Sequence, residues 1–171
     1  MVERHAASFA LLIGIGSNVE PDRWIPWCMG ALRERFGDVV CAPWWMAPSL
    51  GPSGAPDGRP PFVNGAALIH SDLRGPPMRE ALRDIERRAG RRRGPDRYAP
   101  RTLDLDVVGE RGAATDRAVT WRDPAVAEHD HLLLPTAALW PAVSGPGGDT
   151  PLADLAAARA HRLLPWAPSS G

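Results

Sequence analysis

The chain has 171 residues, enough for one domain with a substantial buried core. Its 20 basic and 20 acidic residues give a formal net charge of zero, so no field of the whole molecule favours nucleic acid or a membrane surface. We expect one domain over residues 1–171, with its core in residues 8–159, that binds neither nucleic acid nor membrane, and we also expect a monomer.

The cysteines indicate the cellular compartment, and the basic residues indicate which side chains could bind phosphate. Cys28 and Cys41 are isolated and lack metal-binding spacing, which is typical of reduced thiols in a cytosolic protein. No segment resembles a signal peptide, and no apolar run approaches the ~20 residues of a membrane span. We expect a cytoplasmic protein. Because every basic residue is an arginine, any phosphate would have to be bound by guanidinium groups.

The N-terminal part predicts a strand, a helix and a second strand. Residues 8–15 form an apolar run of strand length that ends at the turn Gly16-Ser17-Asn18. Residues 21–36 have the apolar spacing of a helix, with Pro21 suited to its first position. Residues 38–45 are predicted as the second strand.

Residues 46–61 form what we call the lid segment. Five prolines and three glycines make up half of its sixteen residues, which excludes a regular helix or strand. Long irregular loops inside a compact domain are usually functional or disordered, so we expect a mobile loop that covers a site.

A strand and a helix are predicted after the lid segment. In the strand, residues 62–70, alternation places Phe62 and Asn64 on the same face. Residues 76–89 have a helical apolar stripe that ends at a glycine. Near the end of this helix, Glu86 would orient an arginine, contact a nucleotide or simply be solvated.

Residues 90–101, here called the arginine loop, are expected to be mobile and carry five arginines: Arg91, Arg92, Arg93, Arg97 and Arg101. The loop leads into a predicted strand, residues 102–108, in which residues 102–107 alternate between polar and apolar. Leu103 and Leu105 would face the core, whereas Asp104 and Asp106 would share the opposite face about 6.5–7 Å apart along the backbone.

Two carboxylates on one strand face, next to arginines, point to magnesium and phosphate chemistry. Mg²⁺ is usually held by one or two carboxylates together with the phosphates of a substrate. Guanidinium groups bind phosphate oxygens in pairs. Taken singly, each feature also fits an ordinary solvated surface. Together they are less ordinary, because like charges on one strand face repel unless a cation lies there.

The C-terminal part predicts a short strand at residues 117–121 and a helix at residues 151–159. Between them, His129 and His131 would bind a metal if they were alternate residues of a strand, although stacking or core packing is the preferred interpretation. The whole pattern predicts an α+β sandwich, in which helices pack against a mainly antiparallel sheet.

Three segments resemble the 6-hydroxymethyl-7,8-dihydropterin pyrophosphokinase family, and the likeness spans most of residues 9–155. Residues 100–106, Pro-Arg-Thr-Leu-Asp-Leu-Asp, match the family signature without a break. Residues 14–18 resemble its N-terminal Gly-Ser-Asn turn, and residues 61–66 resemble its Phe/Tyr-x-Asn-Ala segment. The resemblance implies a ferredoxin-like fold.

The resemblance also implies a reaction and a set of site residues. The family transfers the β,γ-diphosphate of ATP to the hydroxymethyl group of the dihydropterin and releases AMP, in folate biosynthesis. It implies two Mg²⁺ ions on Asp104 and Asp106, and catalytic phosphate contacts from Arg91 and Arg101. The implied ATP-binding residues are Glu86, Arg91, Arg93, Tyr98, Arg101, Thr120 and His129. The implied pterin-binding residues are Ser49, Leu50, Phe62, Asn64 and His131.

The chain departs from the family pattern after Trp121. The family commonly has a Pro-His pair followed by Arg-x-Phe, whereas this chain has Asp123 and later His129 and His131. An aspartate that faces phosphate repels it, and a histidine replaces an arginine only when protonated. A paralogue that acts on another pteridine-like or heterocyclic alcohol is therefore one alternative.

An RNA-binding ferredoxin-like module is a second alternative, because such modules also combine a sheet with arginines. That function predicts exposed aromatic residues on the central strands. The expected central strand has only Phe9, and two aspartates on one face would repel a phosphate chain. The sequence therefore favours the pyrophosphokinase interpretation.

Overall fold

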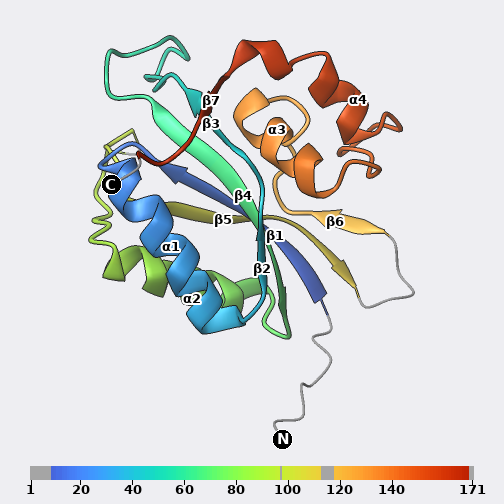
Figure 1. Ribbon diagram of the computed structural model, residues 1–171, viewed down its shortest axis with the longest axis horizontal. Coiled ribbons are helices and arrows are strands. Elements are labelled where there is room, and N and C mark those ends of the chain that lie inside the picture. The colour runs from blue at the N-terminus through green and yellow to red at the C-terminus, as the bar shows by residue number, and fades with distance from the viewer. Residues whose placement is uncertain (1–8, 97, 113–117, 170–171) are drawn as a thin grey trace, which may run out of the picture.

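The computed structural model describes residues 9–96, 98–112 and 118–169. Ser8, Arg97 and Arg117, which fall in predicted segments, lie outside the described residues. Within the described part, a seven-stranded sheet is surrounded by four α-helices and one short 3-10 helix (Figure 1). None of the described helices is long and apolar enough to span a bilayer.

The first two thirds of the chain form a βαββαβ unit, in which the second strand is split into two pieces, β2 and β3. Its elements are β1 (Phe9–Ser17), α1 (Pro21–Phe36), β2 (Val39–Cys41), β3 (Trp44–Ala47), β4 (Phe62–Ser71), α2 (Gly75–Arg88) and β5 (Asp104–Gly112). The sheet order is β6-β5-β1-β4-β3-β7, with β2 also paired to β4, and every pair is antiparallel. This order confirms the predicted ferredoxin-like α+β arrangement.

Two hydrophobic clusters cover the two faces of the sheet. Helices α1 and α2 pack against one face, with their predicted apolar stripes buried on β1 and β4. As expected, α1 begins at Pro21 and α2 is followed by Gly90, which has a positive φ of 77°. Helix α3 (Asp130–Leu139) packs over the opposite face, on the other side of the sheet in Figure 1.

The predicted strand at residues 38–45 is split into β2 and β3, and both pair with β4. Cys41 is opposite Ala67 and Trp45 is opposite Asn64, so four steps on one strand match three on the other. One extra residue at Ala42-Pro43 makes a β-bulge, because proline cannot donate a hydrogen bond to the ladder. The bulge places the Trp44 ring directly over Gly65.

The lid segment has more local structure than its composition predicted. Strand β3 runs into it as far as Ala47, and Leu50 makes an isolated antiparallel bridge with Pro56. The amide of Gly51 donates to Ala55 O at 2.9 Å, and the amide of Asp57 donates to Ser49 O at 3.1 Å. The segment is therefore a small hydrogen-bonded hairpin. Its mobility stays a prediction.

The C-terminal third differs most from the sequence expectations. His129 and Asp130 lie at the start of α3 and not on a strand, so the strand geometry considered for a two-histidine metal site is wrong. The predicted short strand is confirmed as β6 (Val119–Trp121), and the predicted C-terminal helix is shorter, as α4 (Leu152–Ala157). A 3-10 helix (Ala160–Arg162) and a strand that was not predicted, β7 (Leu164–Trp166), follow, and β7 pairs with β3.

The close approach of Trp44 to Gly65 gives a stability prediction. A Cβ atom at Gly65 would lie 2.2 Å from Trp44 Cε3, so Gly65→Ala should lower the free energy of unfolding by about 1–3 kcal/mol through overpacking. Gly30→Ala is the matched control, because nothing lies within 4 Å of its Cβ position in α1, and it should be stabilising by about 0.5–1 kcal/mol. Urea unfolding of both variants measures the difference, and equal effects would contradict the packing argument.

Candidate active site

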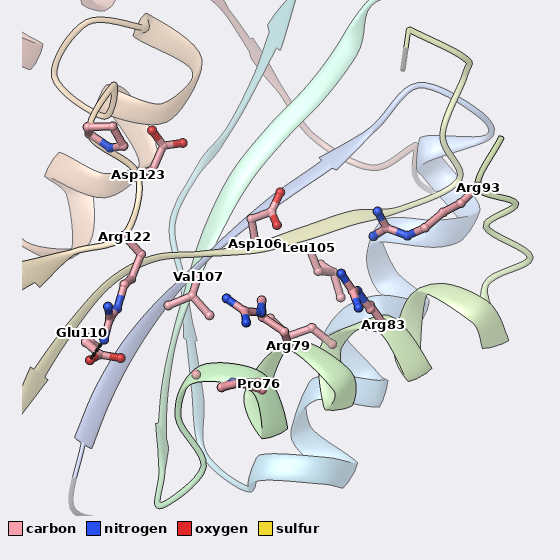
Figure 2. Close-up of a pocket in the computed structure, with 13 residues that line it drawn as sticks. Pro76, Arg79, Arg83, Arg93, Leu105, Asp106, Val107, Glu110, Arg122 and Asp123 are labelled. Carbon is pink, nitrogen blue, oxygen red and sulfur yellow. Dashed lines mark hydrogen bonds and ion pairs between the residues drawn. The ribbon is translucent and has the colours of Figure 1, made fainter. Parts of the chain in front are cut away.

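The two predicted carboxylates lie together on β5. Leu103 and Leu105 are buried on the side of α2, and Asp106 points to the opposite side of the strand from Leu105 (Figure 2). In the ladder, Asp104 is opposite Gly16 and Asp106 is opposite Gly14. The predicted alternation is thus confirmed.

The charge of this strand face is only partly compensated at Asp106. Partial loss of hydration raises the pKa of the Asp106 carboxyl above its usual value, and the negative charges of Asp104 and Glu86 raise it further, whereas Arg93 and Arg101 offset only part of this rise. The structure therefore holds two like charges next to each other at a cost in free energy, which a bound cation would offset.

Arginines from the arginine loop compensate the charge of Asp104. Arg101 hydrogen-bonds one Asp104 oxygen, and Arg91 Nη2 lies 3.5 Å from the other. The Arg91 side chain is 9% exposed, and burial lowers the pKa of its guanidinium. Its Nε is buried and has no hydrogen-bond partner within the described part of the chain. A buried donor without an acceptor is costly, and an anionic ligand would satisfy it.

Glu86 anchors the arginine loop to the same strand. Its side chain is buried, so the solvated interpretation is wrong. Glu86 Oε1 accepts a hydrogen bond from the Leu105 amide at 2.9 Å, and Oε2 accepts one from Arg93 Nη2 at 2.6 Å. This geometry fits the predicted role of orienting an arginine.

Asn18, at the end of the Gly-Ser-Asn turn, holds Arg101 in place. Its side-chain Oδ1 accepts a hydrogen bond from the Arg101 amide at 2.7 Å, and its own amide donates to Arg101 O at 3.0 Å. Asn18 Nδ2 also donates to Pro60 O in the lid segment at 3.3 Å. The sequence predicted the turn at Asn18. It did not predict that Asn18 holds Arg101 and Pro60, because these partners are 83 and 42 residues away in the sequence.

Gly16 leaves an open patch between three predicted site residues. A Cβ atom there would lie 3.4 Å from Asn64 Oδ1, 3.7 Å from Phe62 Cδ1 and 3.9 Å from Asp104 Cβ. The aromatic ring and amide predicted on one face of β4 therefore converge with the first carboxylate of β5 across the bare backbone of β1.

Further predicted site residues lie in the lid segment and at the start of α3. Ser49 is buried and Leu50 is exposed, both at the start of the lid segment. The rings of His129 and His131 stack on each other, with centroids 5.5 Å apart. Burial, and then His129, lower the pKa of His131, which keeps its ring neutral at pH 7. Asp123 Oδ1 accepts a hydrogen bond from the Ala125 amide, so this carboxylate shapes a turn.

A cleft of about 690 Å³ runs between α2 and the uncovered edge of β5 (Figure 2). It reaches Asp106 and Arg93 at one end and Glu110 at the other. Its lining also includes Gly75, Pro76, Arg79, Leu82, Arg83, Leu105, Val107, Arg122, Asp123 and Pro124. Thr120 and His129 are not part of this lining. Glu110 is buried and binds both Arg74 and Arg122 at 2.5 Å, which fixes Arg122 at the end of the cleft.

The donor set fits Mg²⁺ better than a transition metal. Among the described residues, no three or more histidine, cysteine, aspartate and glutamate side chains gather as a metal-binding group. Mg²⁺ does not need such a group, since it retains waters and binds one or two carboxylates plus phosphates. The repulsion at Asp106 and the unsatisfied Nε of Arg91 are what a Mg²⁺-polyphosphate ligand would relieve.

The fold and the site together define a class: ferredoxin-like α+β proteins with paired carboxylates and arginines suited to a polyphosphate ligand. Comparison with known families narrows this class. The family model described as 7,8-dihydro-6-hydroxymethylpterin-pyrophosphokinase (HPPK) matches residues 12–141, well over half of the chain. The chain belongs to the HPPK family, which confirms the resemblance found in its motifs.

Curated relatives carry the name 2-amino-4-hydroxy-6-hydroxymethyldihydropteridine pyrophosphokinase. The protein from Synechocystis is 29% identical over 137 residues, which cover 76% of this chain and 66% of the relative. The protein from Pseudomonas aeruginosa is 36% identical over 100 residues, 56% of this chain and 58% of the relative. The protein from Helicobacter pylori is 26% identical over 132 residues, which cover 74% of this chain and 78% of the relative. The chain thus spans less than two thirds of the length of these first two relatives, 66% and 58%.

The charge repulsion at Asp106 predicts a stabilising substitution. Because the folded-state pKa of Asp106 is raised, its ionised form destabilises the fold above that pKa, and this destabilisation disappears as the pH falls through it. Asp106→Asn should therefore raise the free energy of unfolding at pH 7 without Mg²⁺, by less than about 1 kcal/mol for an exposed charge. Thermal unfolding at pH 7 and at about pH 4 measures this, and the gain should shrink at the lower pH. A destabilised variant at pH 7 would contradict the repulsion.

Proposed function

We propose that this chain is an ATP-dependent pyrophosphokinase of folate biosynthesis. It would transfer the β,γ-diphosphate of ATP to the hydroxymethyl group of 6-hydroxymethyl-7,8-dihydropterin and release AMP. The observation that carries the proposal is the position of Asp104. Its carboxylate binds Arg91 and Arg101, and its Cβ borders the Gly16 patch with Phe62 and Asn64. Family membership supports the same reaction.

The triphosphate would lie between the carboxylates of β5 and the arginine loop. Asp104 and Asp106 would hold Mg²⁺, with two ions expected, and the metal would supply charge neutralisation of the phosphates. Arg91, Arg93 and Arg101 would then turn donors toward phosphate oxygens, with Glu86 and Asn18 holding Arg93 and Arg101 in position.

The nucleoside of ATP would occupy the cleft along β5. Strand β6 covers β5 only from Gly109 to Arg111, which leaves the edge around Val107 open. The Leu105 amide points to this edge, where it meets Glu86, and we propose that the Val107 N–H and C=O face the same edge. A neighbouring donor and acceptor match N1 and the 6-amino group of adenine, and they mismatch the corresponding edge of guanine.

The pterin would lie over the Gly16 patch. The Phe62 ring offers a stacking surface, and the Asn64 amide offers a donor and an acceptor to the edge of a heterocycle. The neutral His131 ring and the exposed Leu50 are the proposed opposite wall. The hydroxymethyl oxygen would then attack the β-phosphorus, breaking its bond to the bridging oxygen of the α-phosphate, and the hydroxyl proton would be lost as AMP leaves.

The departures after Trp121 do not require a different acceptor. The Asp123 carboxylate is used in a turn, and His131 retains a flat neutral ring. Another pteridine-like alcohol remains the second candidate, since a histidine ring covers less area than phenylalanine. We also propose a cytoplasmic monomer, and both cysteines are free thiols, which supports a reducing compartment.

The direct test is to incubate the protein with Mg-ATP and a panel of hydroxymethyl pterins and to assay AMP. We expect AMP, not ADP, in amounts equal to the diphosphorylated 6-hydroxymethyl-7,8-dihydropterin, and a much lower rate with GTP. Asp106→Ala should abolish AMP formation and leave the fold intact, whereas Asp154→Ala, on the exposed side of α4, should retain full activity. ADP as the product, or an active Asp106→Ala variant, would refute the assignment.

Arg101→Ala tests the role of the arginine loop. If Arg101 neutralises charge in the transition state, its loss should lower kcat by about 10²–10³-fold, the effect of removing one preorganised donor. The measurement is steady-state AMP formation with saturating substrates. Activity within twofold of the wild type would remove Arg101 from the mechanism.

A further inference from the structure

One side chain joins the lid segment to the arginine loop. Arg59, in the lid segment, hydrogen-bonds the carbonyl oxygen of Tyr98, and its Nη2 lies 3.7 Å from Asp96 Oδ2. Its Nε lies 3.5 Å from Asp57 Oδ2 in its own segment. A guanidinium group carries five N–H donors in a rigid, charged fork, so one Arg59 side chain makes this hydrogen bond and both ion pairs.

On the lid side, Arg59 is connected to the residues proposed to bind the pterin. Asp57 Oδ1 accepts a hydrogen bond from the Arg59 amide at 3.1 Å, so the two residues are joined through backbone and side chain. The Asp57 amide in turn donates to Ser49 O at 3.1 Å. The contacts therefore run from Arg59 through Asp57 to the base of the hairpin that carries Ser49 and Leu50.

On the other side, Arg59 binds the turn that presents Tyr98. Asp96 Oδ1 accepts a hydrogen bond from the Tyr98 amide at 2.8 Å, and Asp96 O accepts one from the Ala99 amide at 3.2 Å. Arg59 thus binds both the carboxylate that forms this turn and a carbonyl oxygen within it. The same turn leads directly to Arg101.

The contacts of Arg59 are more numerous and less exposed than those of an ordinary surface ion pair. Its side chain is 36% exposed and that of Asp57 is 16% exposed, whereas Asp96 is 55% exposed. A single exposed pair such as Arg59–Asp96 contributes little by itself. One hydrogen bond and two ion pairs from the same guanidinium group link the two segments at several points, which a lone pair does not.

We propose that Arg59 is a positioning residue that couples binding of the acceptor alcohol to binding of the nucleotide. Ordering of the lid segment by one substrate would order the Tyr98 turn through Arg59, so the second substrate would meet a partly ordered site. Coupling of this kind is reciprocal: each substrate raises the affinity for the other by the same factor. The inference rests on the proposed function for the identity of the two substrates.

The first experiment measures this coupling by calorimetry. The ligands are 6-hydroxymethylpterin and Mg²⁺ with α,β-methylene-ATP, whose αβ linkage cannot be cleaved. The Kd of each ligand is measured alone and with the other at saturation. Arg59→Ala should reduce the coupling factor at least about fivefold, the low end of typical coupling. The Kd of each ligand measured alone should change less than about twofold.

Two further variants separate positioning from a general effect. Arg59→Lys keeps the charge but not the fork, so it should recover only part of the coupling. Arg33→Ala, which removes an exposed arginine of α1, should match the wild type. Unchanged coupling in Arg59→Ala, or no coupling in the wild type, would overturn the proposal.

Hydrogen exchange of the ligand-free protein tests the contact without reference to any substrate. Arg59→Ala should speed exchange of the Tyr98 and Ala99 amides and of the Asp57 amide, and Arg33→Ala should not. Asp96→Asn keeps an oxygen that can accept from the Tyr98 amide but loses the charge, so it should act in the same direction. If the wild type binds neither ligand, the proposed function fails, and exchange still decides whether Arg59 joins the two segments. Unchanged exchange in both variants would overturn the inference.

Discussion

Two carboxylates on one face of β5 are the constraint around which the site is arranged. Asp104 and Asp106 are held close together by the strand. Asp104 forms ion pairs with Arg91 and Arg101, whereas Arg93 and Arg101 compensate Asp106 only in part. The other residues of the site serve this arrangement. Glu86 binds the amide of Leu105 and the side chain of Arg93, and Asn18 binds the backbone of Arg101. A site that is electrostatically incomplete without ligand is expected where charge must be brought in with the substrate.

The fold explains how distant segments reach this strand. In the order β5-β1-β4, the first strand of the chain lies between the strand that carries the carboxylates and the strand that carries Phe62 and Asn64. Glycine at position 16 keeps the central strand bare at the point where the three meet. Helix α3 covers the same face further along, over Leu12 and Val108, so the sheet is closed at one end and open at the other. The site occupies the open end.

The alternation of polar and apolar residues in the sequence correctly predicted which side chains share a face of a strand. The alternation of residues 102–108 correctly separated the carboxylates from the core, and parity on β4 correctly paired Phe62 with Asn64. Contacts between segments were not predictable in the same way: Asn18, Arg59 and the Glu110 cluster bind partners far away in the sequence, and no local pattern marks them. Helix α3 was missed because Leu132, Leu133 and Leu134 are all at least partly buried, which removes the apolar stripe by which a helix is recognised.

One edge of the sheet is formed by β3, which follows the bulge at Ala42-Pro43, and by β7, which pairs with it. Strand β7 pairs with β3 and becomes the outermost strand on that side, with Pro165 in its centre opposite Trp45. A proline has no amide proton and is found in sheets mainly on edge strands, so β7 is suited to the outermost position. The C-terminal strand therefore protects β3, and with it the base of the lid segment, from pairing with another polypeptide. Concentrated protein should be less prone to edge-to-edge association on this side than an uncapped sheet would be.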